Sequence, residues 1–402
     1  MRKPLLLTLL LLAPLIASYP PVPDDHLLGD WNGFRTAAAN RGLDLKASYW
    51  NDVQGNPTGG RNQALANAAA LYVTAEADLC RLLNLWPGLS LFASTSYWTG
   101  RNLSQDIGNQ FTVSAWWAPT TYYLDELYLE QAFSYRNTLI RAGRMCADIE
   151  FASSPLFINY ITLAINYNPI SFYFDTPFPA DPFALWAAYF QTDLTPFLTF
   201  KAGAYNGVEG VLDKTYHGFN WSFRTSGGVM LMGQLDLTHR CGTYRFGAYY
   251  VTGRHPLFLG GSATGNHGFY TVCDQQLLKT TCRTLYAWGM GLVAKDDRNK
   301  LPYFFATGLV LEHPKDHTNL GFAFGSFSGQ LRTEISGRVR RGLVGQITTD
   351  PKTYEAVLEL NHWFYIRPGL YLTPLAQWII NPGATSTLPD ALVLGFQLTA
   401  IL

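Results

Sequence analysis

Residues 392–402 read LVLGFQLTAIL. Apolar side chains occupy every second position, and Gly395, Gln397 and Thr399 stand between them. Successive side chains of a strand point to opposite sides, so this segment is predicted to be a strand with one apolar and one polar face. Barrels of the bacterial outer membrane commonly finish on such a strand, usually with an aromatic last residue, and Leu402 departs from that pattern.

The same two-residue period recurs along the chain, in residues 43–51, 71–79, 123–133, 198–205, 229–236, 243–250 and 354–361. Trp50 falls on the polar face of its segment together with Asp44 and Lys46. In residues 123–133 we assign Tyr123 to the apolar face, opposite Glu126 and Glu130, although Asp125 disturbs the alternation. A wall between lipid and water requires this arrangement of side chains.

The composition favours a membrane barrel over a soluble protein. Hydrophobic residues make up 48% of the chain and charged residues only 14%, against about 25% charge in soluble domains. Aromatic residues reach 15%, and Tyr and Trp recur near segment ends, as they do at membrane interfaces. A secreted sandwich shares some of these features. The net charge of zero argues against a nucleic-acid partner.

We therefore predict an all-β fold, a transmembrane antiparallel β-barrel. About 370 mature residues at roughly 23 per strand and turn give about 16 strands, enough for an aqueous channel. Residues 1–18 are interpreted as a signal peptide, with Arg2 and Lys3 before an apolar run. Residues 19–42 are predicted to be a periplasmic segment with a short helix, and residues 43–402 the barrel.

Residues 147–183 break the strand pattern with five prolines and many aromatic residues. A loop of that length is usually functional or disordered. Inside a barrel it would fold inward, so we predict that it forms a constriction loop.

Five cysteines occur at positions 80, 146, 241, 273 and 282. Cys273 and Cys282 bracket a short polar stretch and are a candidate disulfide, the alternative being unpaired thiols. His313 and His317 stand four apart, but Pro314 breaks a helix between them, so we predict no zinc pair. No nucleophile motif stands out. We predict no catalytic residue, no cofactor and no metal.

Three regions together resemble the carbohydrate-selective porins of the OprB family. They are the run GDWNGFR at 29–35 with its following strand, the stretch 126–155 with RAGR at 141–144 and EFASSP at 150–155, and the C-terminal part with RPGL at 367–370 and NPG at 381–383. The region 206–300, the cysteines and Leu402 mark a divergent member. The resemblance implies a sixteen-stranded outer-membrane porin, trimeric or monomeric, that passes monosaccharides down a gradient without cofactor or energy source.

Sugar selectivity needs polar groups that replace water at the hydroxyls and aromatic faces that stack on the ring. Seven residues are candidates for the constriction: Arg144, Asp148, Glu150, Glu126, Glu130, Lys201 and Trp50. Each also has a plainer interpretation, as a solvated lumen residue, a loop charge or the partner of a neighbouring ion. Trp31 and Arg35 are expected to tie the N-terminal segment under the barrel.

Two arginine groups allow alternatives. Arg141 and Arg144 differ by three positions, so a regular strand places them on opposite faces, and we place Arg144 inside. The cluster Arg332, Arg338, Arg340 and Arg341 belongs on a wet loop near lipid phosphates or, alternatively, lines the pore and favours anions.

The leading hypothesis is a passive sugar-selective porin in the bacterial outer membrane, with small sugars and membrane lipids as its partners. The alternatives are a general, anion or amino-acid porin, an outer-membrane barrel enzyme such as a lipase, and a secreted adhesin.

Overall fold

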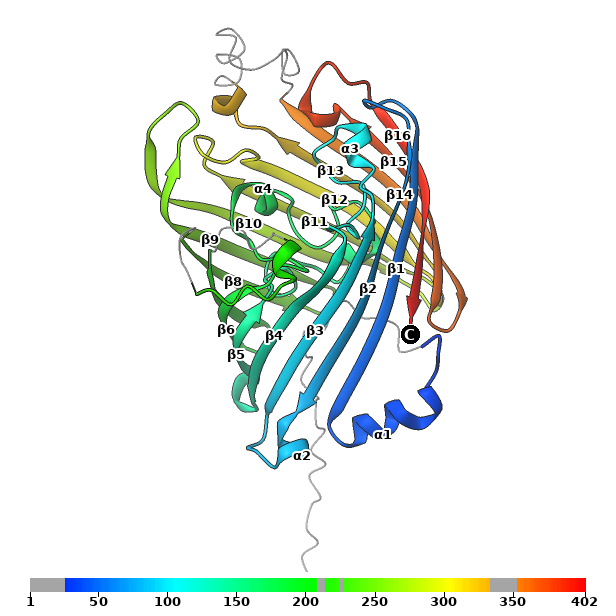
Figure 1. Ribbon diagram of the computed structural model, residues 1–402, viewed down its shortest axis with the longest axis vertical. Coiled ribbons are helices and arrows are strands. Elements are labelled where there is room, and N and C mark those ends of the chain that lie inside the picture. The colour runs from blue at the N-terminus through cyan, green and yellow to red at the C-terminus, as the bar shows by residue number, and fades with distance from the viewer. Residues whose placement is uncertain (1–25, 208–213, 224–227, 333–352) are drawn as a thin grey trace, which may run out of the picture.

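Sixteen antiparallel strands close into a barrel in the computed structural model, which describes residues 26–207, 214–223, 228–332 and 353–402. Each strand pairs with its neighbours in sequence, and the first strand pairs with the last (Figure 1). The strands are β1 (Leu43–Thr58), β2 (Leu65–Asp78), β3 (Leu89–Gly100), β4 (Thr121–Phe133), β5 (Thr138–Met145), β6 (Leu185–Thr195), β7 (Leu198–Asn206), β8 (Val229–His239), β9 (Gly242–Pro256), β10 (Ser262–Lys279), β11 (Thr284–Ala294), β12 (Tyr303–Glu312), β13 (His317–Ser326), β14 (Tyr354–Arg367), β15 (Leu370–Ile380) and β16 (Ala391–Ile401).

Short helices interrupt the connections. They are η1 (Trp31–Gly33), α1 (Phe34–Asn40), α2 (Leu79–Leu83), α3 (Ser104–Ile107), η2 (Tyr135–Asn137), η3 (Phe157–Asn159), α4 (Ser171–Asp175), η4 (Lys214–Tyr216) and η6 (Pro382–Ala384). Among the described helices, none has the length and apolar character needed to cross a bilayer. The barrel and the short N-terminal helix confirm the predicted fold class. The predicted signal peptide lies outside the described residues.

The two rims of the barrel differ in the length of their connections. Between β6 and β7, β8 and β9, and β14 and β15 the chain turns within two residues, and the longest connection at that rim is residues 79–88, which contains α2. At the opposite rim, residues 101–120 join β3 to β4 and residues 146–184 join β5 to β6. We call these two connections loop 2 and loop 3. Bacterial outer-membrane barrels keep their short turns on the periplasmic side.

Side-chain alternation along the strands is as predicted, with one exception. On β16, Leu394 and Phe396 are exposed on the outer wall whereas Gln397 is buried inside. On β4, Ser94 pairs with Glu126 while Thr95 pairs with Leu124, so Asp125 is the extra residue of a β-bulge. The bulge reverses the parity above it. Tyr123 therefore lies inside, 1% exposed, and its assignment to the apolar face was wrong.

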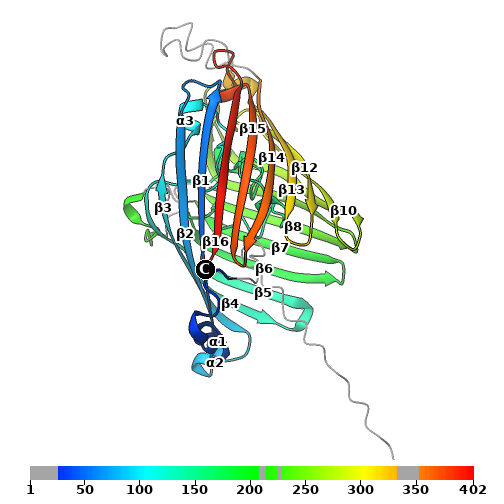
Figure 2. The ribbon, with the colours of Figure 1, turned by 90° about the vertical axis from the view of Figure 1, so that its right-hand side faces the viewer.

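The N-terminal segment lies under the seam between β1 and β16, near the C-terminus (Figure 2). Arg35 donates from Nη2 to the carbonyl oxygen of Leu402 at 2.7 Å, and its guanidinium lies 4.4 Å from the centre of the Trp31 ring. The Leu402 amide donates to Ala47 of β1. These contacts fix the C-terminal end of β16 against β1 and the N-terminal segment.

Of the two alternatives for Cys273 and Cys282, the structure shows unpaired thiols, and none of the five cysteines is bonded to another. Cys273 lies within β10, where its thiol contacts the carbonyl oxygen of Gly289, and Cys282 lies in the turn after that strand. Six residues separate Cys273 from Lys279, where β10 ends, a distance of about 20 Å along a strand. The two thiols therefore do not flank one loop.

Candidate functional site

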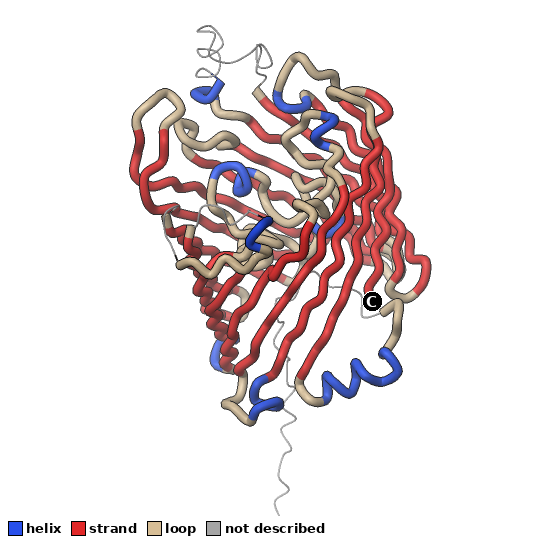
Figure 3. The backbone as a smooth tube through the Cα atoms, in the orientation of Figure 1, coloured by secondary structure: helices blue, strands red, loops and turns tan. Residues whose placement is uncertain are grey.

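Loops 2 and 3 fold into the barrel instead of projecting from its rim (Figure 3). Their apolar side chains pack together and against the inner wall, and Phe111, Phe151, Phe157 and Phe172 are fully buried. Residues 147–183, for which an inward path was predicted, run through the lumen. The space that a solute can use is therefore set by what these loops leave free.

Carboxylates on the wall hold both loops by accepting hydrogen bonds from loop backbone N–H groups. Glu355 of β14 accepts from Gln110 at 2.9 Å and from Phe111 at 2.6 Å. Glu359, four residues further along β14 and on the same face, accepts from Ile161 and Thr162, both at 2.8 Å. A buried N–H without a partner is costly, so a carboxyl oxygen that faces each loop and accepts these hydrogen bonds stabilises the path of the loop.

Four of the predicted constriction residues, Glu126, Glu130, Asp148 and Glu150, belong to a similar anchor at the start of loop 3. Glu126 accepts from the Cys146 amide at 2.8 Å, and Asp148 accepts from the Asp181 amide at 2.9 Å. Burial, with the nearby charges of Asp181 and Glu150, raises the pKa of Asp148 to about 8. We call Glu126, Glu130, Arg141, Asp148 and Glu150 the anchor cluster.

Arg141 is the centre of this cluster. Its Nε donates to Glu130 at 2.6 Å, its Nη1 donates to Glu150, and it lies 5.3 Å from the ring centres of both Tyr128 and Tyr189. Arg141 is only 2% exposed. A buried cation that is bound by two carboxylates and lies against two rings has a structural role and is not available to a solute.

Arg144 lies on the outer wall, so its prediction as a lumen residue was wrong. The register pairs Arg144 with Leu127 on β4 and with Trp186 on β6, and pairs Arg141 with Glu130. β5 remains regular between positions 141 and 144, so the two arginines do face opposite ways. The ionic partners of Arg141 decide which of them is inside.

Lys201 does face the lumen, as predicted, but it is not free to meet a solute alone. Its ammonium lies 2.9 Å from a carboxylate oxygen of Asp236 and donates to the Glu150 carbonyl at 3.2 Å. It therefore joins β7, β8 and loop 3.

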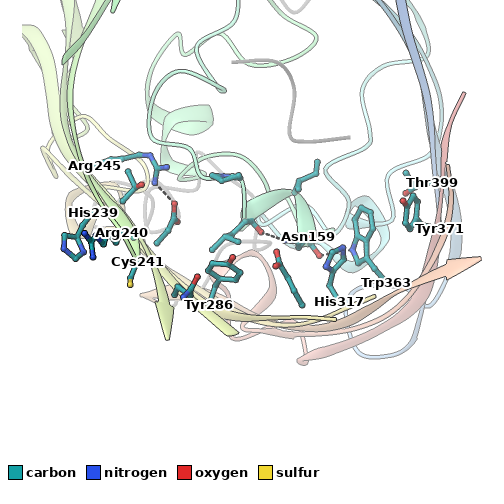
Figure 4. Close-up of a pocket in the computed structure, with 18 of the residues that line it drawn as sticks. Asn159, His239, Arg240, Cys241, Arg245, Tyr286, His317, Trp363, Tyr371 and Thr399 are labelled. Atoms are coloured by element: carbon teal, nitrogen blue, oxygen red, sulfur yellow. Dashed lines mark hydrogen bonds and ion pairs between the residues drawn. The ribbon is translucent and has the colours of Figure 1, made fainter. Parts of the chain in front are cut away.

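A cavity of about 460 Å³ opens between loop 3 and the rim with short turns (Figure 4). Its lining comes from that rim and from loop 3: Trp50, Pro155, Leu156, Ile158, Asn159, His239, Arg240, Cys241, Gly242, Thr243, Arg245, Asp274, Gln276, Tyr286, Glu312, His317, Trp363, Tyr371, Thr399 and Ile401. We call this cavity the vestibule. Its volume is within the range of small-molecule sites, about 300–1,000 Å³. Trp50 is the one predicted site residue that lines it.

Aromatic rings form one side of the vestibule. Trp50 stacks on Trp116 of loop 2 with ring centres 4.1 Å apart, and Trp363 meets Trp50 edge-on at 6.1 Å. Tyr371 lies 5.9 Å from Trp363. The Trp363 indole donates to the Asn159 carbonyl at 3.3 Å, which fixes the ring relative to loop 3. This side offers apolar faces with polar edges.

Charged and amide groups form the other side. Arg245 of β9 donates to Asp274 of β10 at 2.6 Å, and Ser154 of loop 3 donates to the second Asp274 oxygen at 2.6 Å. Glu312 and His317 flank the turn between β12 and β13, and His317 lies on the aromatic side, with its ring centre 5.9 Å from that of Trp363. Figure 4 shows Arg245 on one side of the space and His317, Trp363, Tyr371 and Thr399 on the other. A ring-shaped polar solute could meet both kinds of group at once.

The lining residues missed from the sequence divide into two kinds. Arg245 stood on the polar face of a predicted strand, so alternation had already placed it inside. Trp363, Tyr371 and His317 had no such signal, because they come together only through the register, in which Trp363 pairs directly with His317. Within the described part of the chain, no three His, Cys, Asp or Glu residues are grouped to hold a metal ion.

Comparisons with known proteins agree with this geometry. Residues 62–401 match the model of the carbohydrate-selective porin, OprB family. The chain is 24% identical to Porin B of Pseudomonas aeruginosa over 93% of its own length and 91% of that protein, and 22% identical to the putative porin QuiX of Acinetobacter baylyi over 92% of each. The high-pH structure of Pseudomonas putida OprB superposes with a TM-score of 0.86 at 22% identity, covering 96% of this chain and all of that one.

Proposed function

We propose a path for solute from one premise, that this chain belongs to the OprB family of carbohydrate-selective porins, whose model spans residues 62–401. It is a channel of the bacterial outer membrane and not an enzyme. The rim with short turns faces the periplasm, and loops 2 and 3 enter the lumen from the outside. Small sugars diffuse through it down their gradient.

The vestibule is the site at which a sugar is bound during passage. The observation that supports this is the pairing of two surfaces across one cavity, the rings of Trp50, Trp363 and Tyr371 on one side and the Arg245–Asp274 pair on the other. Aromatic faces bind the C–H face of a pyranose, and polar groups replace water at its hydroxyls. Binding must remain weak for the solute to leave.

Uncharged solutes fit this lumen better than ions. Lys201 is paired with Asp236, Arg245 with Asp274 and Arg141 with two carboxylates, so these cations bring little net charge to the path. Of the arginine cluster considered for anion passage, Arg338, Arg340 and Arg341 lie outside the described residues. The anchor cluster acts indirectly, by holding loop 3 in the position that narrows the lumen.

Swelling of protein-loaded liposomes tests the proposal. Monosaccharides should enter faster than uncharged, non-sugar solutes of the same size, and a sugar should reduce the ionic current through single channels in a planar bilayer. Equal rates for sugars and size-matched solutes would contradict sugar selectivity. Faster entry of anions or amino acids than of sugars would favour the alternative of a general or charged-solute porin.

A further inference from the structure

The outer wall has a notch beside the top of β5. β5 has eight residues and its last pair with β4 joins Arg144 to Leu127, so β4 continues from Thr121 to Glu126 without a β5 partner. An unpaired strand edge exposes backbone N–H and C=O groups, and in contact with lipid these groups need a partner.

Residues 214–223, from the connection between β7 and β8, fill this notch from the outside. We call this segment the flap. The Leu124 amide donates to the His217 carbonyl at 3.0 Å, and the His217 ring stacks on Tyr122 at 4.3 Å. Gly218 has a φ of +74°, and a Cβ there would lie 2.2 Å from the Leu124 carbonyl oxygen, so only glycine allows this approach.

Arg144 holds the flap from below. Its Nη1 donates to the Asn220 carbonyl, its Nη2 donates to the Ala184 carbonyl at 2.8 Å, and its guanidinium lies 5.7 Å from the Trp221 ring centre. The Trp186 indole donates to the Trp221 carbonyl at 3.2 Å. A cation on an outer barrel wall is costly in lipid, and here the flap covers it to 2% exposure.

The side chains that the flap turns outward are aromatic. Tyr216, Phe219, Trp221 and Phe223 are 48%, 50%, 46% and 74% exposed. From Thr215 to Phe223 the sequence contains no Lys, Arg, Asp or Glu. The flap lies at the level of Tyr122, which pairs with Tyr97 across β3 and β4, and both tyrosines are exposed near the ends of their strands at the rim with long loops. Tyr and Trp at this level mark the interface between lipid chains and headgroups.

We propose that the flap is a lipid-binding surface that continues the aromatic belt of the outer leaflet across the notch, with Arg144 as its positioning residue. The occupant is the interfacial layer of the membrane, at the depth where acyl chains meet headgroups. Continuity with the exposed tyrosines of β3 and β4 favours lipid over water, as does the absence of Lys, Arg, Asp and Glu from Thr215 to Phe223, which is all of the flap except Lys214. The proposal is independent of which solute passes through the lumen.

Depth-dependent quenching of Trp221 tests this inference. The full-length protein is reconstituted in bilayers whose lipids carry bromine either near the headgroup or near the chain end, and the Trp221 emission is obtained as the difference between the wild type and Trp221→Phe. We expect stronger quenching by the shallow bromines. The lumen residue Trp363, measured in the same way with Trp363→Phe, should be quenched by neither lipid.

Two other outcomes would overturn the proposal. Absence of quenching by both lipids would place Trp221 in water or under a second copy of the chain, and light scattering of the detergent-solubilised protein would identify the second case. Stronger quenching by the deep bromines would place Trp221 among the acyl chains and not at the interface. In Arg144→Gln the flap loses the charge-assisted contacts, and the shallow quenching of Trp221 should fall, whereas the sugar entry rate should not change.

Discussion

The anchor cluster and the vestibule both lie inside the barrel, but their polar groups have different roles. In the anchor cluster, Arg141 and its carboxylates are buried and bond to one another or to the loop backbone, although Arg141 Nη2 and Glu150 Oε2 have no hydrogen-bond partner. In the vestibule, Trp363 and Arg245 border a space of about 460 Å³. The difference shows that strand parity decides which face of the wall a side chain is on, while the loops decide whether it meets water or protein.

The comparison is tested most strongly by removing the charge at the centre of the anchor cluster. Arg141→Met leaves Glu130 and Glu150 buried without their cation, and breaking a buried pair costs about 3–5 kcal/mol. We expect the free energy of unfolding, measured by urea titration in lipid vesicles, to fall by that amount.

Lys46→Met is the matched control for this change. Lys46 pairs with Asp44 at 3.1 Å, but both side chains are nearly half exposed, so the loss should be less than about 1 kcal/mol. If the two variants lost equal stability, the anchor cluster would not be the structural element that we describe.

The pH dependence of stability tests the same cluster through Asp148, in loop 3. The pKa of its carboxyl is raised from 3.8 to about 8, so between these values the folded protein keeps a proton that the unfolded chain releases. The contribution of this group to stability should therefore be complete at and below about pH 4 and be lost as the pH rises toward 8. The slope is at most about 1.4 kcal/mol per pH unit for this group.

Asp148→Asn removes the titrating group while keeping an oxygen that can accept from the Asp181 amide. Urea titrations of the variant across the same pH range should show a shallower fall than the wild type. Asp175, in α4 of loop 3, has a pKa raised by burial to about 7 and contributes in the same direction, so some slope should remain. An unchanged slope in the variant would show that Asp148 is not the group responsible.

Much of the barrel could be predicted because alternation is a local property. The inward position of Trp50 and the outward leucines of β16 follow from the sequence of single strands. The bulge at Asp125 does not, since in the sequence it shows only as a disturbed alternation that does not reveal an extra residue, and Tyr123 was misplaced as a result. Arg144 was misplaced for a related reason, because parity separates two arginines without saying which one is inside.

The site was predictable only in part, because its lining is assembled by register and by loop packing. Glu126, Asp148 and Glu150 were predicted to line the constriction, but the hydrogen bonds that they make depend on the path of loop 3, residues 146–184, through the barrel. The Trp363 indole donates to the Asn159 carbonyl only because loop 3 places η3 beside β14. No periodicity in either segment indicates this meeting.

The vestibule side of the comparison is tested by removing its central ring. Trp363→Ala should weaken the sugar-dependent block of single-channel current about tenfold, or about 1.4 kcal/mol, because a stacking face is lost. Trp378→Ala is the matched control, since Trp378 of β15 is 40% exposed on the outer wall and should leave the block unchanged. An unaltered block in Trp363→Ala would move the sugar site away from the vestibule.

The smallest effect is expected where the vestibule contains a charge pair. Arg245→Gln removes one cation beside the cavity, but Asp274 keeps its hydrogen bond from Ser154 and borders the open space, so the stability loss should be only about 1 kcal/mol. The zero-current potential in a salt gradient should shift toward cation preference, because the Asp274 charge is no longer balanced. Glu126→Gln, in the anchor cluster, should do the reverse, changing stability but not ion preference, since that carboxylate is bonded to the Cys146 amide and meets no solute. A shift of potential in Glu126→Gln as large as in Arg245→Gln would mean that ions pass through the anchor cluster, and the distinction between the two regions would fail.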